Sequence, residues 1–335
     1  MIYLISASYA NEYELQNYIP LLESHEIKVI TSHHPLTHTT MSTVPLWSLT
    51  DLPMFPFRRQ ILNRLIGGEQ WLFGLEKIVH KVDILHTAET YTPYTHQAVK
   101  LRKAGMIKKL ICTCWETIPH NNESLTWLKK WKNEAYQYVD IFHVPTQCAR
   151  KALINEGVEP SKIIVIPYGV SRERFQKVTT KIVNKKPIVL TVARSVSDKG
   201  YDHYHTIINP IRSLADFRWV SNLSYDDVPT AFTEADIFFL PSQVSSTWEE
   251  QYGMVLIEAM MAGLPIVSTT SGAIPEVVGE AGLLSVPSDY EDMTNKLYSL
   301  ISDPLRRAIY SQRSLKRSKR YEVNRIAKKL VKLYT

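Results

Sequence analysis

The chain has 335 residues, which is long for one hydrophobic core, so we expect two domains. Apolar residues make up 44% and charged residues 21%, as in soluble globular proteins, and no apolar stretch reaches the roughly 18 residues that a membrane-spanning helix needs. The formal charge of +6 suits anionic lipid, nucleic acid or a phosphate-bearing substrate, but the short signatures of nucleic-acid binding are missing, so we expect no nucleic-acid partner.

The start of the chain, MIYLISASYANEYE, is a short apolar run closed by acids, without a basic leader, and is interpreted as a first strand. We therefore expect a cytoplasmic protein. Peripheral membrane contact stays open, because Pro56–Phe73 and Trp127–Tyr138 combine cations with aromatic residues at helical spacing. The alternative is that both are helices packed on a sheet with a solvated basic side.

Short β-branched runs alternate with longer amphipathic stretches, which is typical of an α/β protein with parallel sheets. In the first half the predicted strands are Ile2–Ser6, Ile27–Thr31, Ile84–His86, Leu110–Thr113, Ile141–Pro145 and Ile163–Ile166, and the predicted helices include Thr95–Ala104, Trp127–Tyr138 and Thr146–Glu156. In the second half the predicted strands are Pro187–Ala193, Phe217–Ser221, Ile237–Leu240, Pro265–Ser268 and Leu283–Val286, and the predicted helices are Tyr252–Ala262, Tyr290–Ser299 and Leu305–Leu333.

The polar, basic stretch over residues 171–186 has no clear period and is the predicted linker. It separates a Rossmann-like domain of residues 1–170 from a second one of residues 187–304, and residues 305–335 form a C-terminal helix. Ligands of such sheets bind beyond the carboxyl ends of the strands. The expected site is therefore a cleft between the domains.

The most informative segment is WEEQYGMVLIEAMMAGLPIV, from Trp248 to Val267. Glu258 lies in an otherwise apolar helix, and Glu250 lies in the loop before it. Side chains on a helix point toward its N-terminus, where free N–H groups and the helix dipole favour a phosphate. A charge among apolar neighbours is costly unless it is paired or binds a ligand. The alternative reading is a salt-bridged helix acid and an ordinary loop acid.

These residues resemble the retaining glycosyltransferases of the GT-B fold, in the large family 4 that includes sucrose and glycogen synthases. The family signature is E-x7-E, and Glu250 and Glu258 have that spacing. The segments Val165–Phe175, Thr191–Gly200 and Ser271–Pro287 are also similar to family elements. The resemblance implies two Rossmann-like domains facing each other across a cleft, with the C-terminal helix returning to the N-terminal domain.

The resemblance also implies roles for the second half of the chain. Glu258 would hold the ribose of a UDP- or GDP-sugar, and Glu250 the hydroxyls of the donor sugar. Backbone N–H groups of Tyr252, Gly253 and Met254 would lie beside that sugar. Ser271 and Gly272 would lie near the phosphates.

Arg194 and Lys199 follow a predicted strand, five residues apart. A diphosphate leaving group gains negative charge as the glycosidic bond breaks, and two fixed cations can stabilise that charge without a metal. We therefore predict that Arg194 and Lys199 have this role and that no metal or other cofactor is needed. The alternative is two solvated loop cations.

The first half resembles the family less closely. No glycine follows the first strand, where many members have a Gly-Gly loop, and Trp115 stands where many have a histidine. Glu116 is the candidate catalytic side chain here, and His120 is predicted to bind substrate, since either could polarise a hydroxyl near neutral pH. The alternative is that His120 is an ordinary surface or capping residue. Trp115, Glu89 and Tyr91 are predicted to bind an acceptor, which is a saccharide, a lipid-linked molecule or another hydroxyl compound.

Other functions remain as alternatives. A non-catalytic nucleotide-sugar-binding protein could use the same fold, because fold alone does not determine activity. An epimerase or a phosphorylase would need acid-base groups or a phosphate site that the sequence does not indicate. A dehydrogenase is disfavoured because no G-x-G-x-x-G follows the first strand.

Overall fold

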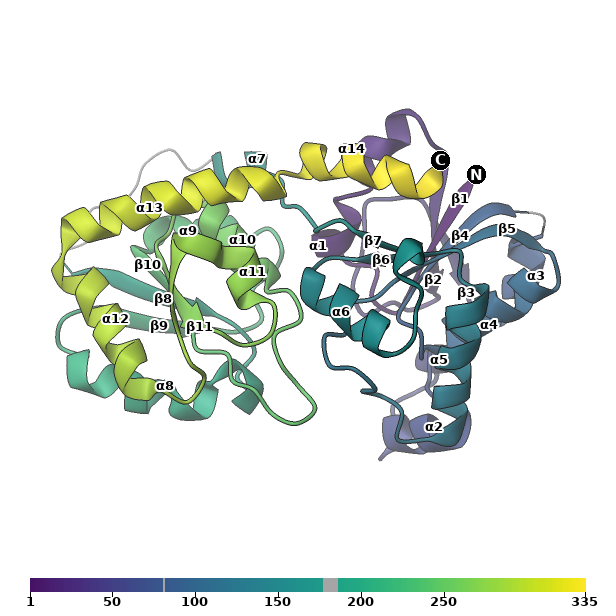
Figure 1. The fold of residues 1–335 in the computed structure, drawn as a ribbon, viewed down its shortest axis with the longest axis horizontal. Coiled ribbons are helices and arrows are strands. Elements are labelled where there is room, and N and C mark those ends of the chain that lie inside the picture. The colour runs from purple at the N-terminus through teal and green to yellow at the C-terminus, as the bar shows by residue number, and fades with distance from the viewer. Residues whose placement is uncertain (81, 177–185) are drawn as a thin grey trace. The chain divides into compact units, whose positions relative to one another are not determined.

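The computed structural model describes residues 1–80, 82–176 and 186–335, and the chain forms two compact units. The first unit comprises Met1–Pro145, Ala149–Pro167 and Ala327–Thr335, and the second comprises Thr146–Cys148 and Tyr168–Ile326. In Figure 1 the strands of each unit are flanked by helices. Of the predicted linker, residues 177–185 lie outside the described residues, and residues 171–176 belong to the second unit.

The first unit is built on a parallel sheet with the strand order β3-β2-β1-β4-β5-β6-β7. Its strands are β1 (Ile2–Ala7), β2 (Ile27–Ser32), β3 (Thr43–Leu46), β4 (Val82–Ala88), β5 (Ile107–Thr113), β6 (Ile141–Val144) and β7 (Ile163–Val165). The central strands are buried on both faces, which explains their continuous apolar runs. The sequence pattern did not predict β3, because this short, half-exposed edge strand contains Pro45.

The second unit has a parallel sheet with the order β12-β11-β10-β8-β9. Its strands are β8 (Ile188–Val192), β9 (Asp216–Val220), β10 (Ile237–Leu240), β11 (Ile266–Thr269) and β12 (Gly282–Ser285). All five lie within a residue or two of the predicted strands. The predicted α/β class with two Rossmann-like domains is therefore confirmed.

Helices connect the strands in both units. Those of the first unit are α1 (Glu12–Leu15), α2 (Arg58–Ile66), α3 (Leu75–Ile78), α4 (Pro93–Lys103), α5 (Thr126–Tyr138) and most of α6 (Gln147–Asn155). Those of the second unit are α7 (Glu173–Gln176), α8 (Tyr201–Ile208), α9 (Val228–Glu234), α10 (Met254–Met261), α11 (Ile274–Val278), α12 (Tyr290–Ser302) and α13 (Pro304–Ser318). Among the residues described, no helix combines the length and apolar character needed to cross a bilayer.

The C-terminal segment corrects one prediction. In place of a single helix over Leu305–Leu333, the chain forms α13, a 3-10 turn over Lys319–Tyr321 and α14 (Val323–Tyr334). Tyr321 explains the break, because its hydroxyl donates to the carbonyl of Val277 and its own carbonyl accepts from Val170 N–H. Such tertiary hydrogen bonds override a helical sequence pattern.

Candidate functional site

The carboxylate of Glu250 lies beyond the carboxyl ends of β8 and β10, in the loop before α10. Its Oε2 accepts a hydrogen bond from Ser242 Oγ at 3.1 Å and pairs with Lys199 Nζ at 2.5 Å. Lys199 ends a 3-10 turn after β8, and its ammonium lies 4.8 Å from the centre of the Trp248 ring. The Glu250 side chain is only 10% exposed, so Lys199 rather than water compensates its charge.

The turn after β11 holds the backbone of Glu250. Ser271 Oγ accepts from Glu250 N–H at 3.0 Å and donates to the carbonyl of Gln243 at 2.9 Å. Ala273 N–H donates to the carbonyl of Glu250. Gly272 has a φ of +48°, and a Cβ there would overlap that same carbonyl. Ser271 and Gly272 thus position Glu250, and their contact with substrate stays a prediction.

Glu258 lies one turn into α10 with its side chain buried. Arg174 Nη1 donates to Glu258 Oε1 at 3.0 Å, and the Arg174 guanidinium lies 3.5 Å from the centre of the Tyr225 ring while donating to the Tyr225 carbonyl. Burial raises the pKa of Glu258 to about 7, and Arg174 opposes that rise. Arg174 therefore helps keep this carboxylate ionised at neutral pH.

The other predicted donor-side residues have different surroundings. Tyr252 is buried, and its hydroxyl donates to the Tyr168 carbonyl at 2.5 Å. Gly253 has a φ of +78° and precedes Met254, the first residue of α10. Arg194 is exposed and makes no ion pair with another residue that the structure describes. Of the two predicted cations, only Lys199 contacts a predicted acid.

A pocket of about 610 Å³ lies in the first unit, beyond the carboxyl ends of β1 and β4. Three residues predicted to bind an acceptor, Glu89, Tyr91 and Trp115, line it. Its wall also includes Tyr9, Glu14, Arg59, Asn63, Gly68 and Tyr94. Aromatic faces together with convergent polar groups are suited to binding a sugar.

Two carboxyl groups in this pocket have shifted pKa values. Burial raises the pKa of Glu89 to about 8, although a hydrogen bond from Trp115 N–H to its Oε1 at 2.8 Å opposes the rise. Burial likewise raises the pKa of Glu14 to about 7. Burial also raises the pKa of the Tyr91 hydroxyl well above its ordinary value. At neutral pH the protonated Glu89 carboxyl and the Tyr91 hydroxyl can therefore donate hydrogen bonds to a ligand as well as accept them.

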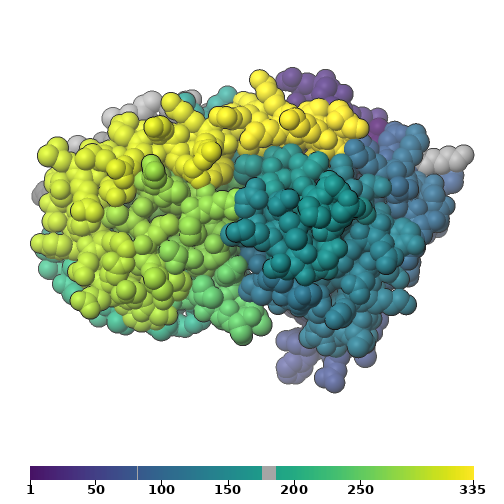
Figure 2. All heavy atoms as spheres, viewed as in Figure 1, coloured from purple at the N-terminus to yellow at the C-terminus, as the bar shows by residue number. Residues whose placement is uncertain are grey.

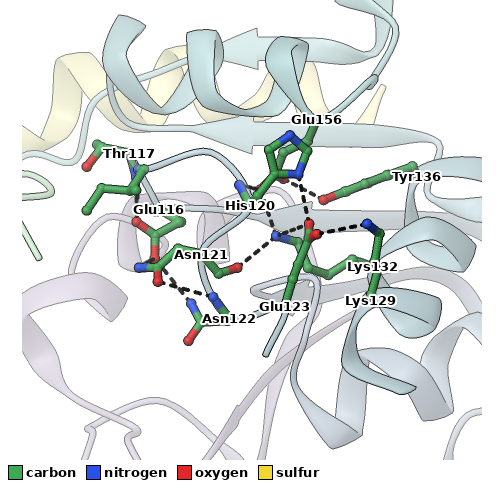
Figure 3. A network of polar contacts seen from close by, with 11 residues as sticks. Glu116, Thr117, His120, Asn121, Asn122, Glu123, Lys129, Lys132, Tyr136 and Glu156 are labelled. Atoms are coloured by element: carbon green, nitrogen blue, oxygen red, sulfur yellow. Dashed lines mark hydrogen bonds and ion pairs between the residues drawn. The ribbon is translucent and has the colours of Figure 1, made fainter. Parts of the chain in front are cut away.

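Glu116 and His120 do not line this pocket but belong to the polar network in Figure 3. The two carboxylate oxygens of Glu116 accept hydrogen bonds within its own loop, from the Thr117 and Ile118 N–H groups and from the Asn121 and Asn122 side chains. His120 is exposed, with a φ of +62°. In the structure both residues shape the loop after β5.

The same network contains three groups with the residue types of a metal site. Ligand atoms of His120, Glu123 and Glu156 lie within 4.8 Å of one another. The Lys132 ammonium, however, lies 2.6 Å from Glu156 Oε1 and 3.1 Å from Glu123 Oε1 (Figure 3). A buried ammonium between the two carboxylates makes this an ion-pair network.

Two charged residues were missed by sequence reasoning. Arg174 lies inside the segment Val165–Phe175 that carried the family resemblance, yet nothing local indicates that it pairs with Glu258. Glu14 is one of the acids that close the first apolar run, and its place in the pocket depends on how α1 follows β1.

Comparison with known proteins identifies relatives of both units. The family model of glycosyltransferase family 4 matches residues 19–174, and that of glycosyl transferases group 1 matches residues 211–317. A 41.2 kDa protein of the Klebsiella pneumoniae cps region is 26% identical over 262 residues, covering 66% of this chain and 69% of that protein. The Arabidopsis thaliana sulfoquinovosyl transferase SQD2 is 26% identical over 238 residues, covering 59% of this chain but only 46% of SQD2.

A solved structure shows the same fold over the whole chain. Anabaena HepE in complex with UDP superposes with a TM-score of 0.72 and 16% identity, covering 99% of this chain and 98% of HepE. The two parallel α/β units are those of the GT-B fold, and the two matched models cover most of both. The chain therefore has the GT-B fold, with a segment that matches the glycosyltransferase family 4 model followed by a segment that matches the glycosyl transferases group 1 model.

Proposed function

We propose that the protein is a retaining glycosyltransferase that moves a sugar from a nucleotide-diphosphate donor to a hydroxyl of a saccharide, lipid-linked or other acceptor. The observation that carries this proposal is the pair of compensated carboxylates in the second unit, Glu250 with Lys199 and Glu258 with Arg174. They have the E-x7-E spacing and follow β10, at the sheet edge where α/β proteins bind ligands.

On the donor side, Glu258 would accept hydrogen bonds from the ribose hydroxyls and Glu250 from the sugar. Both carboxylates already have a cationic partner, so a bound donor must share or replace it. If Lys199 moved from Glu250 to the diphosphate, one cation would stabilise the leaving group and free a carboxylate oxygen for the sugar. Exposed Arg194 would supply the second cation, and Tyr252–Met254 the backbone N–H groups.

On the acceptor side, the pocket of the first unit would hold the acceptor, with contacts from Glu89, Tyr91 and Trp115. Glu116 and His120 would act by shaping the loop that carries Trp115. The donor phosphate itself would serve as the base for the acceptor hydroxyl, on the face from which it leaves, so the anomeric configuration would be retained.

A panel of UDP- and GDP-sugars tests this proposal. The correct donor should raise the thermal unfolding midpoint, because ligand that binds only the folded state stabilises it. That donor should also be hydrolysed slowly or transferred, and NMR of the product should show the donor's anomeric configuration. An inverted product would refute the retaining mechanism. Stabilisation without turnover would favour the alternative, a non-catalytic nucleotide-sugar-binding protein.

The same assay tests the proposed independence from metal. If Arg194 and Lys199 neutralise the diphosphate, turnover should persist in EDTA. Loss of turnover in EDTA that magnesium or manganese restores would contradict the roles of these two cations.

A further inference from the structure

Helix α2 and the residues before it present apolar side chains to solvent. Met54 is 82% exposed, Phe57 72%, Ile61 42% and Leu65 70%. Ile61 and Leu65 are four residues apart and lie on one side of the helix, and Phe57 directly precedes its first residue. We call these four residues the α2 apolar face. In Figure 2 this slate-blue segment protrudes at the lower edge of the first unit.

The α2 apolar face lies among cations. Between Leu52 and Gly68 the sequence contains Arg58, Arg59 and Arg64 and no acid. Arg64 is exposed three residues after Ile61, on the same side of the helix, whereas exposed Arg59 lies on the side that lines the pocket. An exposed apolar face next to an exposed arginine is complementary to an anionic lipid surface, whereas a core helix would bury its apolar side.

Residues at the two ends of α2 fix the helix to the first unit. Arg58 is buried and pairs with Glu69 at 3.2 Å. Gly67 ends the helix with a φ of +79°, and a Cβ there would overlap the Trp131 ring on α5. These contacts hold α2 in place at both ends, so the outward direction of the α2 apolar face is determined by the fold.

The same helix borders the pocket. Arg59 and Asn63, four residues apart, line the pocket together with Gly67 and Gly68. A single helix therefore contributes one side to the pocket wall and another to the α2 apolar face. Anything bound by that face would lie next to the pocket.

We propose that the α2 apolar face docks on an anionic lipid bilayer and holds the pocket of the first unit at the membrane surface. The inference that the acceptor is presented at that surface rests on the function proposed above, whereas docking itself does not. A bilayer fits better than a protein partner because the exposed groups are apolar side chains and arginines without an acid among them.

Co-sedimentation with vesicles tests the docking. The protein should bind vesicles of phosphatidylcholine mixed with phosphatidylglycerol, and bind those of phosphatidylcholine alone more weakly. The double variant Phe57→Ser, Leu65→Ser should bind the mixed vesicles at least about tenfold more weakly, because membrane affinity scales with the apolar area inserted. Arg64→Gln should keep part of the binding and reduce its dependence on salt.

The double variant Leu305→Ser, Ile309→Ser is the matched control, since it removes two exposed apolar side chains, 78% and 53% exposed, from the basic helix α13. It should bind like the wild type, and both double variants should keep the wild-type unfolding midpoint. Docking through α2 is refuted if the wild type does not sediment with mixed vesicles, if the Phe57, Leu65 variant still does, or if only the α13 variant loses binding.

This experiment and the donor panel fail independently. Vesicle binding needs no donor, and donor stabilisation needs no vesicle. A protein that turns over the donor but does not bind vesicles would refute docking and leave the transferase proposal intact. A protein that binds vesicles but neither binds nor turns over a donor would refute the transferase proposal and leave docking intact.

Discussion

At the residue scale, Glu89 joins the ends of two strands. It follows β4 with a φ of +59°, a left-handed conformation that is uncommon outside glycine and often found at functional sites. Its carboxylate accepts a hydrogen bond from Trp115 N–H, just after β5. Glu89 thus helps to place Trp115 on the pocket wall.

Glu89 should make stability depend on pH. Its pKa is about 8 in the folded protein against an ordinary 4.5, so its contribution to stability is complete below pH 4.5 and is lost as the pH rises through about 8. Glu14, with a pKa of about 7, acts in the same direction. Glu89→Gln removes one ionisation and should make the loss of stability over this range shallower in urea titrations. Glu23→Gln, at an exposed acid, should not.

Glu258 is the residue whose proposed role is most directly measurable. Glu258→Gln should leave the fold intact but weaken nucleotide binding by roughly 1.5–3 kcal/mol, because hydrogen bonds to a charged acceptor become neutral ones. Calorimetric titration with UDP and GDP measures the change. Glu249→Gln, next to Glu250, is the control and should bind like the wild type. Equal affinity of the Glu258 variant would remove this residue from the site.

At the scale of elements, the turn from β11 into α11 determines where Glu250 lies. Ser271 and Ala273 each form a hydrogen bond with the Glu250 backbone, and Gly272 lets the two backbones approach closely. A loop acid is thereby held by a second loop that follows a neighbouring strand. The turn after β11 therefore positions the loop that carries Glu250.

Gly272→Ala should therefore damage donor binding. Its Cβ would overlap the Glu250 carbonyl, and the residue also needs a φ of +48°. Gly105→Ala is a matched control, because Gly105 has a φ of +71° but no atom within 4 Å of the added Cβ. The control should cost about 1 kcal/mol from the backbone conformation alone, with donor affinity unchanged. Similar donor affinities in the two variants would contradict the proposed positioning by this turn.

At the scale of the whole molecule, the end of the chain completes the first unit. Tyr334 lies near the C-terminus, and its hydroxyl is 2.8 Å from His86 Nδ1 on β4. His86 Nε2 is hydrogen-bonded to Thr113 Oγ1 on β5, and Thr113 Oγ1 is hydrogen-bonded to His143 Nδ1 on β6. Burial lowers the pKa of His143 to about 4 and that of His86 well below its ordinary value. Both histidines are therefore neutral in the folded protein at neutral pH.

This buried chain predicts acid sensitivity. Because both folded pKa values are depressed, the stability that the neutral histidines contribute is present above pH 6.5 and is lost as the pH falls toward about 4. Tyr334→Phe would leave His86 Nδ1 without its partner and should cost about 1–3 kcal/mol at neutral pH. Urea denaturation of the full chain measures both effects. Tyr298→Phe, 49% exposed, should be neutral; an equal loss there would argue against the buried chain.

The sequence by itself determined the α/β class, most strands and the positions of the candidate acids. Strands buried on both faces need continuous β-branched runs, and Glu258 is conspicuous because few charges occur inside an apolar helix. These are local signals, carried by residues close together in the chain. They did not predict β3, whose short, half-exposed edge pattern is weak, or the break between α13 and α14.

Only the tertiary structure decided which charges meet. Lys199 and Glu250 are 51 residues apart, and Arg174 and Glu258 are 84 apart, so no periodicity or propensity relates them. The pocket combines loops after β1, β4 and β5 with one side of α2, and the raised pKa values of Glu14 and Glu89 follow from burial there. Burial and pairing arise when segments distant in sequence fold together, so local sequence patterns do not predict them.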